Sequence, residues 1–335
     1  PMLSVLATAA RSHGSATPSR TVAAQPEEIG YYDTSIWFSS HASIRNESKV
    51  TDLIESLTRP TLMCPTKARV GTTDSDGGYV ICKEWDIPRV LEAMGEESCL
   101  VYSFGIKDDY DVENQLVAQG CEVHGFDPTV DREDDMQFHF HKVGLGARDE
   151  VIAGLGPVQN MSTLLGEYGR ASTRRLSVFD CDIEGSEWAS FSAMSDAQWK
   201  SMDLLVLELH FTDDTLDDAA VQRYWDALAP LRKHFHLFHS HVNNCGGYRR
   251  NEKESKEDRV FFPNLFELSL INKAVAAKLG FEAAPDPAPF TSNSGSLDAP
   301  NVWQGCAPDN KPYDIVCKCG TAAHDCSCHK VDLTD

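Results

Sequence analysis

The chain has 335 residues, with 51 acidic and 30 basic side chains and a formal charge of -21 at neutral pH. This balance argues against a nucleic-acid-binding surface, because phosphate binding draws on clustered Lys and Arg. No apolar run approaches the roughly 20 residues of a membrane span, and a hydrophobic fraction of 41% suffices for a core of one large α/β domain or two small ones.

The first 50 residues are expected to form a flexible arm. Arg11 and Arg20 lie among Ser and Ala, and no acid precedes Glu27. This composition suits either an organellar transit peptide or a stem beyond a removed membrane anchor. A short helix is expected from Val50 to Leu57, with its apolar side chains on one side.

A hairpin is expected next. Asp76-Gly-Gly78 is a turn signal, and Tyr79 to Cys82 has the composition of a strand. The hairpin is either a plain structural element or a flap over a cofactor pocket.

The segment from Leu100 to Pro128 has the pattern strand, turn, helix, strand. Leu100 to Phe104 is a short apolar run ending at Gly105, which allows a tight turn. Asp108, Asp109 and Asp111 offer cap oxygens for a helix that stops at Gly120. Cys121 to Phe126 is predicted to be a second strand, with Asp127 at its carboxyl end.

In an open α/β sheet, ligands bind beyond the carboxyl ends of the strands, so Gly105 and Asp127 are expected to face one crevice. A carboxylate there accepts hydrogen bonds from both hydroxyls of a ribose. Dehydrogenases and S-adenosylmethionine-dependent methyltransferases share this arrangement. The turn has one glycine and three nearby acids, which repel a pyrophosphate but tolerate a sulfonium. A nucleotide-free α/β turn is the alternative.

Five further strands are predicted, alternating with helices around 161–167, 186–200 and 219–232, the second capped by Ser186. This alternation predicts a doubly wound α/β sheet. We interpret His139 and His141 as one polar strand face rather than metal ligands, because no acid or cysteine stands at matching spacing. Residues 249–259 are expected to be solvated, and a linker or surface wrap begins near 283. The five strands are Phe138–Val143, Leu176–Ile183, Leu204–His210, Phe235–Val242 and Leu265–Ile271.

The 11 cysteines include five between Cys306 and Cys328. Disulfides are expected to staple this tail, since zinc sites more often separate paired cysteines by two to four residues than by one. With the sequons at Asn46 and Asn160, the cysteines favour an oxidising compartment in the secretory pathway, either the Golgi lumen or the exterior. The arm leaves a mitochondrion or chloroplast as the alternative.

Several motifs occur in one order: Asp76-Gly-Gly-Tyr79, Ser103-Phe-Gly105, Val123-His-Gly-Phe-Asp-Pro128, Val143-Gly-Leu-Gly146, Asp180-Cys-Asp-Ile-Glu-Gly-Ser-Glu-Trp188 and Leu207-Glu-Leu-His210. Together they resemble the methyltransferase-like domain family related to FkbM-type sugar O-methyltransferases. The resemblance covers roughly residues 60–275. It implies a class I, Rossmann-like seven-stranded sheet, S-adenosylmethionine as cofactor and O-methylation of a small-molecule or glycan acceptor. The cofactor positions it implies are Phe104, Gly105, Asp127 and Asp182.

By the same resemblance, Asp182, Glu184 and His210 fall at strand ends beside the methyl-transfer point. They are expected to act as a base or to hold Mg²⁺ or Mn²⁺. With an unperturbed pKa of about 6.5, His210 would be neutral, as a base must be. Asn243 and Asn244 offer further oxygens. Alternatively, Glu184 orients the next helix and His210 is a satisfied core residue.

The expected organisation is an arm (1–50), a methyltransferase domain (51–275), and a Pro/Ser-rich wrap with a cysteine-rich tail (276–335). Three functions are compatible with it: a glycan O-methyltransferase, a non-catalytic scaffold or assembly subunit of the same fold, and a nucleotide-dependent oxidoreductase. The turn sequence disfavours the third. The sequence does not indicate whether the protein is a monomer or an oligomer.

Overall fold

The structure is a computed structural model that describes residues 40–42, 44–72, 78–83, 87–107, 109–131, 137–169, 175–243, 247–253, 260–284, 290–291, 313–320 and 326–332. All of them belong to one compact unit, Tyr31–Asp335. Most of the predicted arm (1–39 and 43), the hairpin turn at Asp76-Gly77, and Asp108, Asn244 and Cys306 lie outside the described residues.

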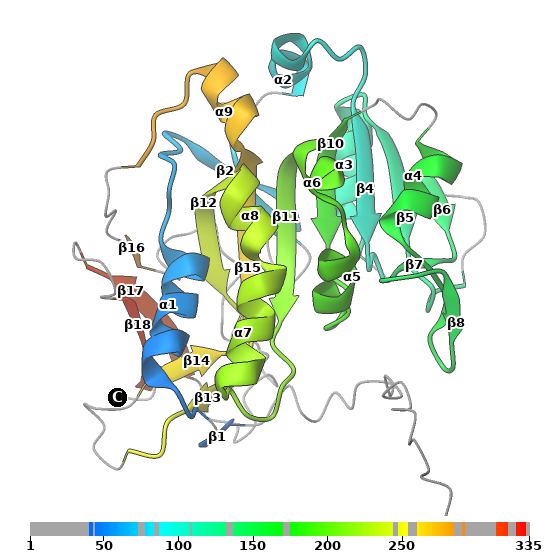
Figure 1. Ribbon diagram of the computed structural model, residues 1–335. Coiled ribbons are helices and arrows are strands. Elements are labelled where there is room, and N and C mark those ends of the chain that lie inside the picture. Colours follow the sequence, from blue (N-terminus) through cyan, green and yellow to red (C-terminus); the bar gives the residue numbers. More distant parts are fainter. Residues whose placement is uncertain are drawn as a thin grey trace, which may run out of the picture. The chain divides into compact units, whose positions relative to one another are not determined.

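A seven-stranded mixed sheet lies at the centre of this unit, in the order β12-β15-β11-β10-β4-β5-β6 (Figure 1). The strands from β11 to β6 are parallel, and β15 is antiparallel to both of its neighbours. The seven predicted apolar runs each overlap one of these strands. The strands are β4 (Leu100–Phe104), β5 (Glu122–Phe126), β6 (His139–His141), β10 (Leu176–Cys181), β11 (Met202–His210), β12 (Phe235–Val242) and β15 (Leu265–Asn272).

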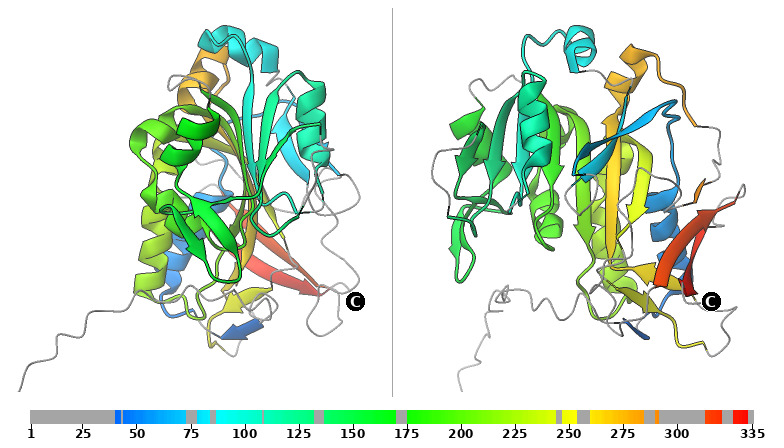
Figure 2. Two further views of the ribbon diagram at one scale, coloured as in Figure 1. Left: turned by 90° about the vertical axis from the view of Figure 1, so that its right-hand side faces the viewer. Right: turned by 180° about the vertical axis from the view of Figure 1, so that it is seen from behind.

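Helices cover both faces of the sheet, because alternate residues of its strands are buried on opposite sides. Tyr102 and Phe179 pack with α1 (Glu47–Thr58), α4 (Met161–Tyr168), α5 (Glu187–Ala193), α6 (Asp196–Lys200), α7 (Asp218–Ala227) and α8 (Ala229–His234). Val101 and Val178 pack with α2 (Ile87–Met94), α3 (Asp111–Ala118), α9 (Lys273–Leu279) and the hairpin of β2 (Lys67–Gly71) and β3 (Gly78–Cys82). Figure 2 shows α3 and the hairpin on the face opposite α7 and α8.

Two predicted helices are each divided in two. The helix expected over 186–200 breaks after α5, because Ser195 caps α6 with a full capping box. Ser186 stands at the N-cap of α5 but makes no side-chain cap bond. The helix expected over 219–232 ends at Ala227, and Pro230 lies in the first turn of α8, where its missing N–H costs no helical bond.

The start of α3 also differs from expectation. Its N-cap is Tyr110, without a side-chain bond, although the backbone N–H of Asp111 donates to the Asp109 carboxylate at 3.1 Å. Gly120 follows the helix with φ +87°, as expected of a residue that ends a helix.

Besides the two-stranded sheet of the β2–β3 hairpin, short strands in the described ranges form three smaller sheets. One of them contains Arg249, which is 1% exposed and whose guanidinium donates to Asn264. The prediction of a solvated stretch beginning at Arg249 is therefore wrong. The sheets contain β1 (Ser40–Ala42), β13 (Tyr248–Arg250) and β14 (Phe261–Pro263); β7 (Gly144–Leu145), β8 (Glu150–Ile152) and β9 (Gly156–Gln159); and β16 (Phe290–Thr291), β17 (Tyr313–Cys319) and β18 (Cys326–Asp332).

Disulfides join cysteines in the body and the tail. Cys317 pairs with Cys328 and Cys319 with Cys326 across β17 and β18, which bears out the disulfide interpretation of this part of the tail. Two more bridges, Cys64–Cys82 and Cys99–Cys121, lie in the body. Cys181, which is buried, is the unpaired thiol among the described cysteines. These pairs suit an oxidising compartment.

Both sequon asparagines are helix N-caps. The side-chain oxygen of Asn46 accepts from the Lys49 N–H, and that of Asn160 accepts from Ser162 and Thr163. None of the helices in the described ranges is long and apolar enough to cross a bilayer. The three-part organisation remains a prediction, with α1 starting at Glu47, three residues before the predicted start.

Candidate functional site

The sheet reverses its direction of growth between β4 and β10. The chain adds β5 and β6 on one side of β4, then β10 and β11 on the other. In sheets of this kind, the crevice at such a reversal is where ligands bind. The loops after the two strands touch there, with the Asp182 N–H donating to the Phe104 carbonyl at 3.0 Å.

Gly105 is required by this close approach. It has φ +86°, and a Cβ built on it would lie 1.6 Å from the Asp182 carbonyl oxygen. Lys107 also has a positive φ, at 43°. The predicted tight turn is therefore present, and the glycine serves a contact between two loops of the protein. Its contact with a cofactor remains a prediction.

The Phe104 side chain is part of the hydrophobic core. Its ring is buried and stacks on Phe126, with 4.7 Å between the ring centroids. Any contact of this residue with a cofactor would have to come from its backbone.

Asp127 stands at the end of β5, as expected, and is 4% exposed. One carboxylate oxygen accepts from the Lys107 N–H at 3.0 Å. The other accepts from the N–H and hydroxyl of Thr129, at 2.8 and 2.6 Å. Asp127 therefore joins the turn after β4 to the turn after β5. A carboxylate has about four lone-pair sites, so Asp127 can accept further hydrogen bonds in addition to these three.

The three residues predicted to activate the acceptor meet at the ends of β10 and β11. His210 Nε2 lies 3.6 Å from an Asp182 oxygen and 3.5 Å from a Glu184 oxygen. Glu208, two residues earlier on β11, has an oxygen 4.0 Å from the same nitrogen. One ligand atom from each of Asp182, Glu208 and His210 lies within 4.8 Å of the others, a spacing from which a metal ion could be held.

The other side of the imidazole is fixed by α5. His210 Nδ1 lies 2.9 Å from Glu187 Oε1, which also accepts from the Ile183 N–H at 3.2 Å. The Trp188 indole N–H donates to the His210 carbonyl. A carboxylate on one imidazole nitrogen leaves the other aimed at the crevice, as in many metal-bound histidines.

His210 is not the neutral base that its ordinary pKa predicted. Burial lowers the pKa of His210, but the surrounding carboxylates, above all Glu187, outweigh burial and raise the pKa to about 9. In this environment the imidazole carries a proton at neutral pH, unless a cation takes its place.

Sequence reasoning missed Glu208 and Glu187. Glu208 shares a strand face with His210, since side chains two apart point the same way, and this periodicity could have found it. It also accepts from the Asn243 amide at 3.1 Å, so Asn243 reaches the cluster. Glu187 follows the strand in a helix, and only the three-dimensional arrangement brings it to His210.

Glu184 has a strained backbone, with φ +56°. A non-glycine residue in this region costs on the order of 1–3 kcal/mol, and such strain gathers at functional sites. Its side chain is 63% exposed, so Glu184 lies at the rim of the cluster.

A second group of acids is buried behind the crevice. The Ser103 hydroxyl contacts one oxygen each of Glu113 and Asp180, at 2.5 and 3.2 Å, and Tyr79 also hydrogen-bonds Asp180. Burial raises the pKa of Glu113 to about 7, against the hydrogen bond from Ser103. Burial, and then the charge of Glu113, raises the pKa of Asp180 well above its ordinary value.

The free energy of unfolding is expected to fall as the pH rises from about 4.5 to 7, because folded Glu113 holds its proton over a range where the unfolded residue has lost it. Glu113→Gln, which keeps an acceptor for Ser103, should be more stable than the unmodified protein at pH 8 by on the order of 2–3 kcal/mol. Denaturant unfolding at pH 5 and pH 8 measures this. The exposed Glu92→Gln is the control, and equal pH slopes in all three proteins would contradict the expectation.

A family model described as "Methyltransferase domain" matches residues 34–253. The probable methyltransferase-like protein 24 of Homo sapiens is 27% identical over 161 residues, covering 43% of this chain and 43% of the relative. The protein of the same name from Rattus norvegicus is 27% identical over 196 residues, covering 52% and 53%. The chain therefore spans about half the length of the curated relatives it matches.

Proposed function

Because the chain belongs to the methyltransferase-domain family, we propose that it transfers a methyl group from S-adenosylmethionine to a sugar hydroxyl of a glycan. The family implies the cofactor. The class I arrangement and the sugar acceptor rest on the motif resemblance to FkbM-type enzymes. One observation carries the proposal: Asp182, Glu208 and His210 gather at the strand ends beside the Gly105 turn, where the sheet reverses.

The cofactor is proposed to lie over the loops after β4 and β5. Asp127 would accept hydrogen bonds from its ribose hydroxyls, and Gly105 and Asp182 would line the crevice. The Phe104 backbone would complete this edge. The sulfonium carries positive charge, and the carboxylates of the crevice favour a cation over a pyrophosphate.

The donor set at the end of β10 and β11 fits a divalent cation. Carboxylate oxygens suit Mg²⁺ and Mn²⁺, and His210 Nε2 faces them because Nδ1 is held by Glu187. Asp182, Glu208 and His210 would hold the metal, with Glu184 at the rim towards the acceptor. Bound there, a divalent cation would lower the pKa of a hydroxyl that it contacts.

A metal-free version of the same site is also open to test. Because His210 carries a proton in the described environment, the base would then be a carboxylate, Asp182 or Glu184. Activity that survives a chelator unchanged would favour this version and exclude the metal.

One observation favours a non-catalytic scaffold as the second candidate function. Asp127 is almost fully buried, and both of its oxygens already join two loops of the protein. A residue used in this way would be retained even in a descendant that no longer binds a cofactor.

Calorimetric titration with S-adenosylhomocysteine separates these functions. Binding, followed by transfer of labelled methyl to a panel of glycans, supports the methyltransferase. A folded protein that binds neither S-adenosylhomocysteine nor NAD is a scaffold, and one that binds only NAD is an oxidoreductase.

Asp127→Ala is expected to weaken S-adenosylhomocysteine binding by tenfold or more, because hydrogen bonds to a charged group contribute about 1.5–3 kcal/mol. Thr129→Ala is the matched control, since it removes one of the internal bonds of Asp127 and leaves the carboxylate. Titration calorimetry on both folded variants measures the difference. Unchanged affinity in Asp127→Ala would refute the ribose contact.

The site of action is proposed to be the secretory pathway, either the Golgi lumen or the exterior. The disulfides of the body and tail support this proposal, because reducing compartments such as the cytosol keep cysteine thiols reduced.

A further inference from the structure

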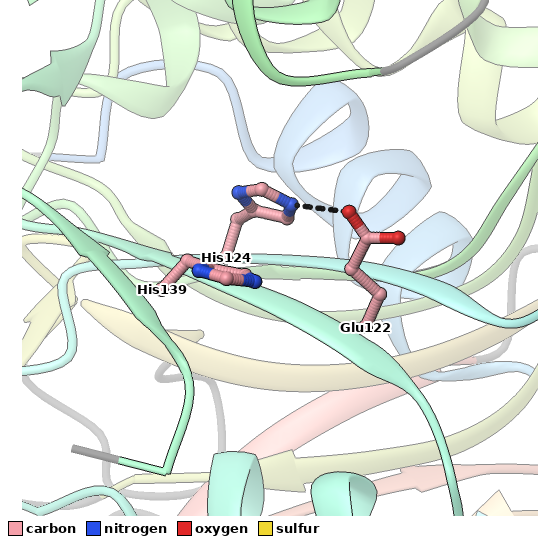
Figure 3. Close-up of side chains that lie close together, drawn as sticks. All are labelled: Glu122, His124 and His139. Atoms are coloured by element: carbon pink, nitrogen blue, oxygen red, sulfur yellow. Dashed lines mark hydrogen bonds and ion pairs between the residues drawn. The ribbon is translucent and has the colours of Figure 1, made fainter.

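A second cluster of side chains of the types that ligate metals lies near the amino ends of β5 and β6. Glu122 and His124 are two residues apart on β5, so their side chains project from the same face. The register pairs His124 with His139 on the edge strand β6. Figure 3 shows Glu122 and His124 on one side of β5, with His139 beside His124.

We interpret His139 and His141 as a polar strand face because no acid stands at matching spacing along the sequence, but the structure brings Glu122 close to His139. The acid comes from the neighbouring strand rather than from the same stretch of sequence. One ligand atom each from Glu122, His124 and His139 lies within 4.8 Å of the others.

The spacing of the first two ligands already matches a metal site. His124 Nε2 lies 3.1 Å from Glu122 Oε1. Two ligands that each lie about 2.0–2.1 Å from a tetrahedral zinc ion are about 3.3 Å apart. The His139 side chain is exposed on the edge strand. It can therefore change rotamer to bring its ring nitrogen to the metal. Solvent reaches the cluster from the side of His139.

A fourth residue orients the central ligand. His124 Nδ1 lies 2.9 Å from His141 Nε2, and the two rings stack with an interplanar angle of 11°. Histidines that bind metals commonly engage their second nitrogen in such a bond, which fixes the direction of the first.

We propose that Glu122, His124 and His139 bind a divalent transition-metal ion, with Zn²⁺ as the best match. Two imidazoles and one carboxylate are a common ligand set for zinc, and a solvent water would fill the fourth position. The carboxylate-rich cluster at His210 is suited instead to Mg²⁺ or Mn²⁺. The two sites are on different strands and differ in ligand chemistry.

The position of the site points to a structural role. Strand β6 has three residues, His139 to His141, and forms the edge of the sheet. The Asp127 N–H donates to the His141 carbonyl at 3.1 Å, so β6 also supports the loop that carries the proposed ribose contact. A metal joining His124 to His139 would hold this edge strand against β5.

The 335-residue chain, with its disulfides oxidised, is first stripped of metal by a chelator. It is then titrated with Co²⁺, whose tetrahedral complexes absorb visible light, and Zn²⁺ is added to displace the bound Co²⁺. Glu122→Gln and His139→Ala should each weaken binding at least about tenfold. His139→Asp, which restores a ligand, should recover part of it. His236→Ala removes a histidine outside the cluster and should bind like the unmodified protein.

Asp182→Asn distinguishes this site from the cluster at His210, and should retain the Co²⁺ signal. The proposal is overturned if His139→Ala binds as tightly as the unmodified protein, or if Asp182→Asn abolishes the signal. Because His139 is exposed, its variants should keep the circular dichroism of the unmodified protein. Glu122→Gln provides an independent variant if they do not.

Discussion

Methyl transfer is expected to fall by about two to four orders of magnitude when His210 is replaced by alanine, because the carboxylates proposed to activate the acceptor would lose the imidazole that positions them, and positioned proton-transfer groups accelerate reactions by this range. The imidazole is the group that Asp182, Glu184 and Glu208 all approach, so its loss would leave three carboxylates facing one another. S-adenosylhomocysteine affinity should change less than about twofold, because His210 acts on the acceptor side. Turnover with labelled cofactor and calorimetry provide the two measurements.

His239→Ala is the matched control, since His239 is also a buried histidine of the central sheet but contacts Lys67 instead. It should lose stability without a comparable loss of turnover. Near-normal turnover in His210→Ala would place the activating group elsewhere. A chelator that removes activity from the unmodified protein, with recovery on adding Mn²⁺ or Mg²⁺, would identify the metal-assisted version.

Gly105→Ala is expected to destabilise the fold by about 3 kcal/mol or more and to abolish cofactor binding. Alanine at φ +86° is itself strained, by roughly 1–2 kcal/mol. Its Cβ would also meet the Asp182 carbonyl at 1.6 Å, and backbone on both sides must move to relieve this overlap. Denaturant unfolding measures the first effect and calorimetry with S-adenosylhomocysteine the second.

Gly120 offers a close control for that substitution. Its φ is +87°, and a Cβ there meets nothing within 4 Å. Gly120→Ala should therefore cost only the conformational strain, and the difference between the two variants isolates the contact with Asp182. Equal losses of stability would show that the two loops do not approach as described.

The sheet could be predicted from the sequence because each strand is a short apolar run between turn residues. The run Leu204–His210 falls within β11, a strand with both faces covered. The helix breaks were harder to predict. The residues of 186–200 have continuous helical character, and the capping box at Ser195 competes with it locally.

The candidate site could be predicted only in part. Asp182, Glu184 and His210 were found because strand ends converge, a rule that follows from topology. The pKa of His210 depends on Glu187, which approaches from helix α5. The contact between these two residues could not be predicted from their residue types or their positions in the sequence. Likewise, the partnership of Glu122 with His139 depends on which strands are neighbours and in which register.

The Cys99–Cys121 bridge closes the strand–helix unit that carries Gly105 into a covalent ring. If the chain is stretched from its two ends, force bypasses the residues inside that ring. The bridge spans a sequence separation of 22 residues, which at about 3.5 Å per extended residue hides roughly 75 Å of contour length. The proposed cofactor turn would therefore remain unextended under tension until the bridge is reduced.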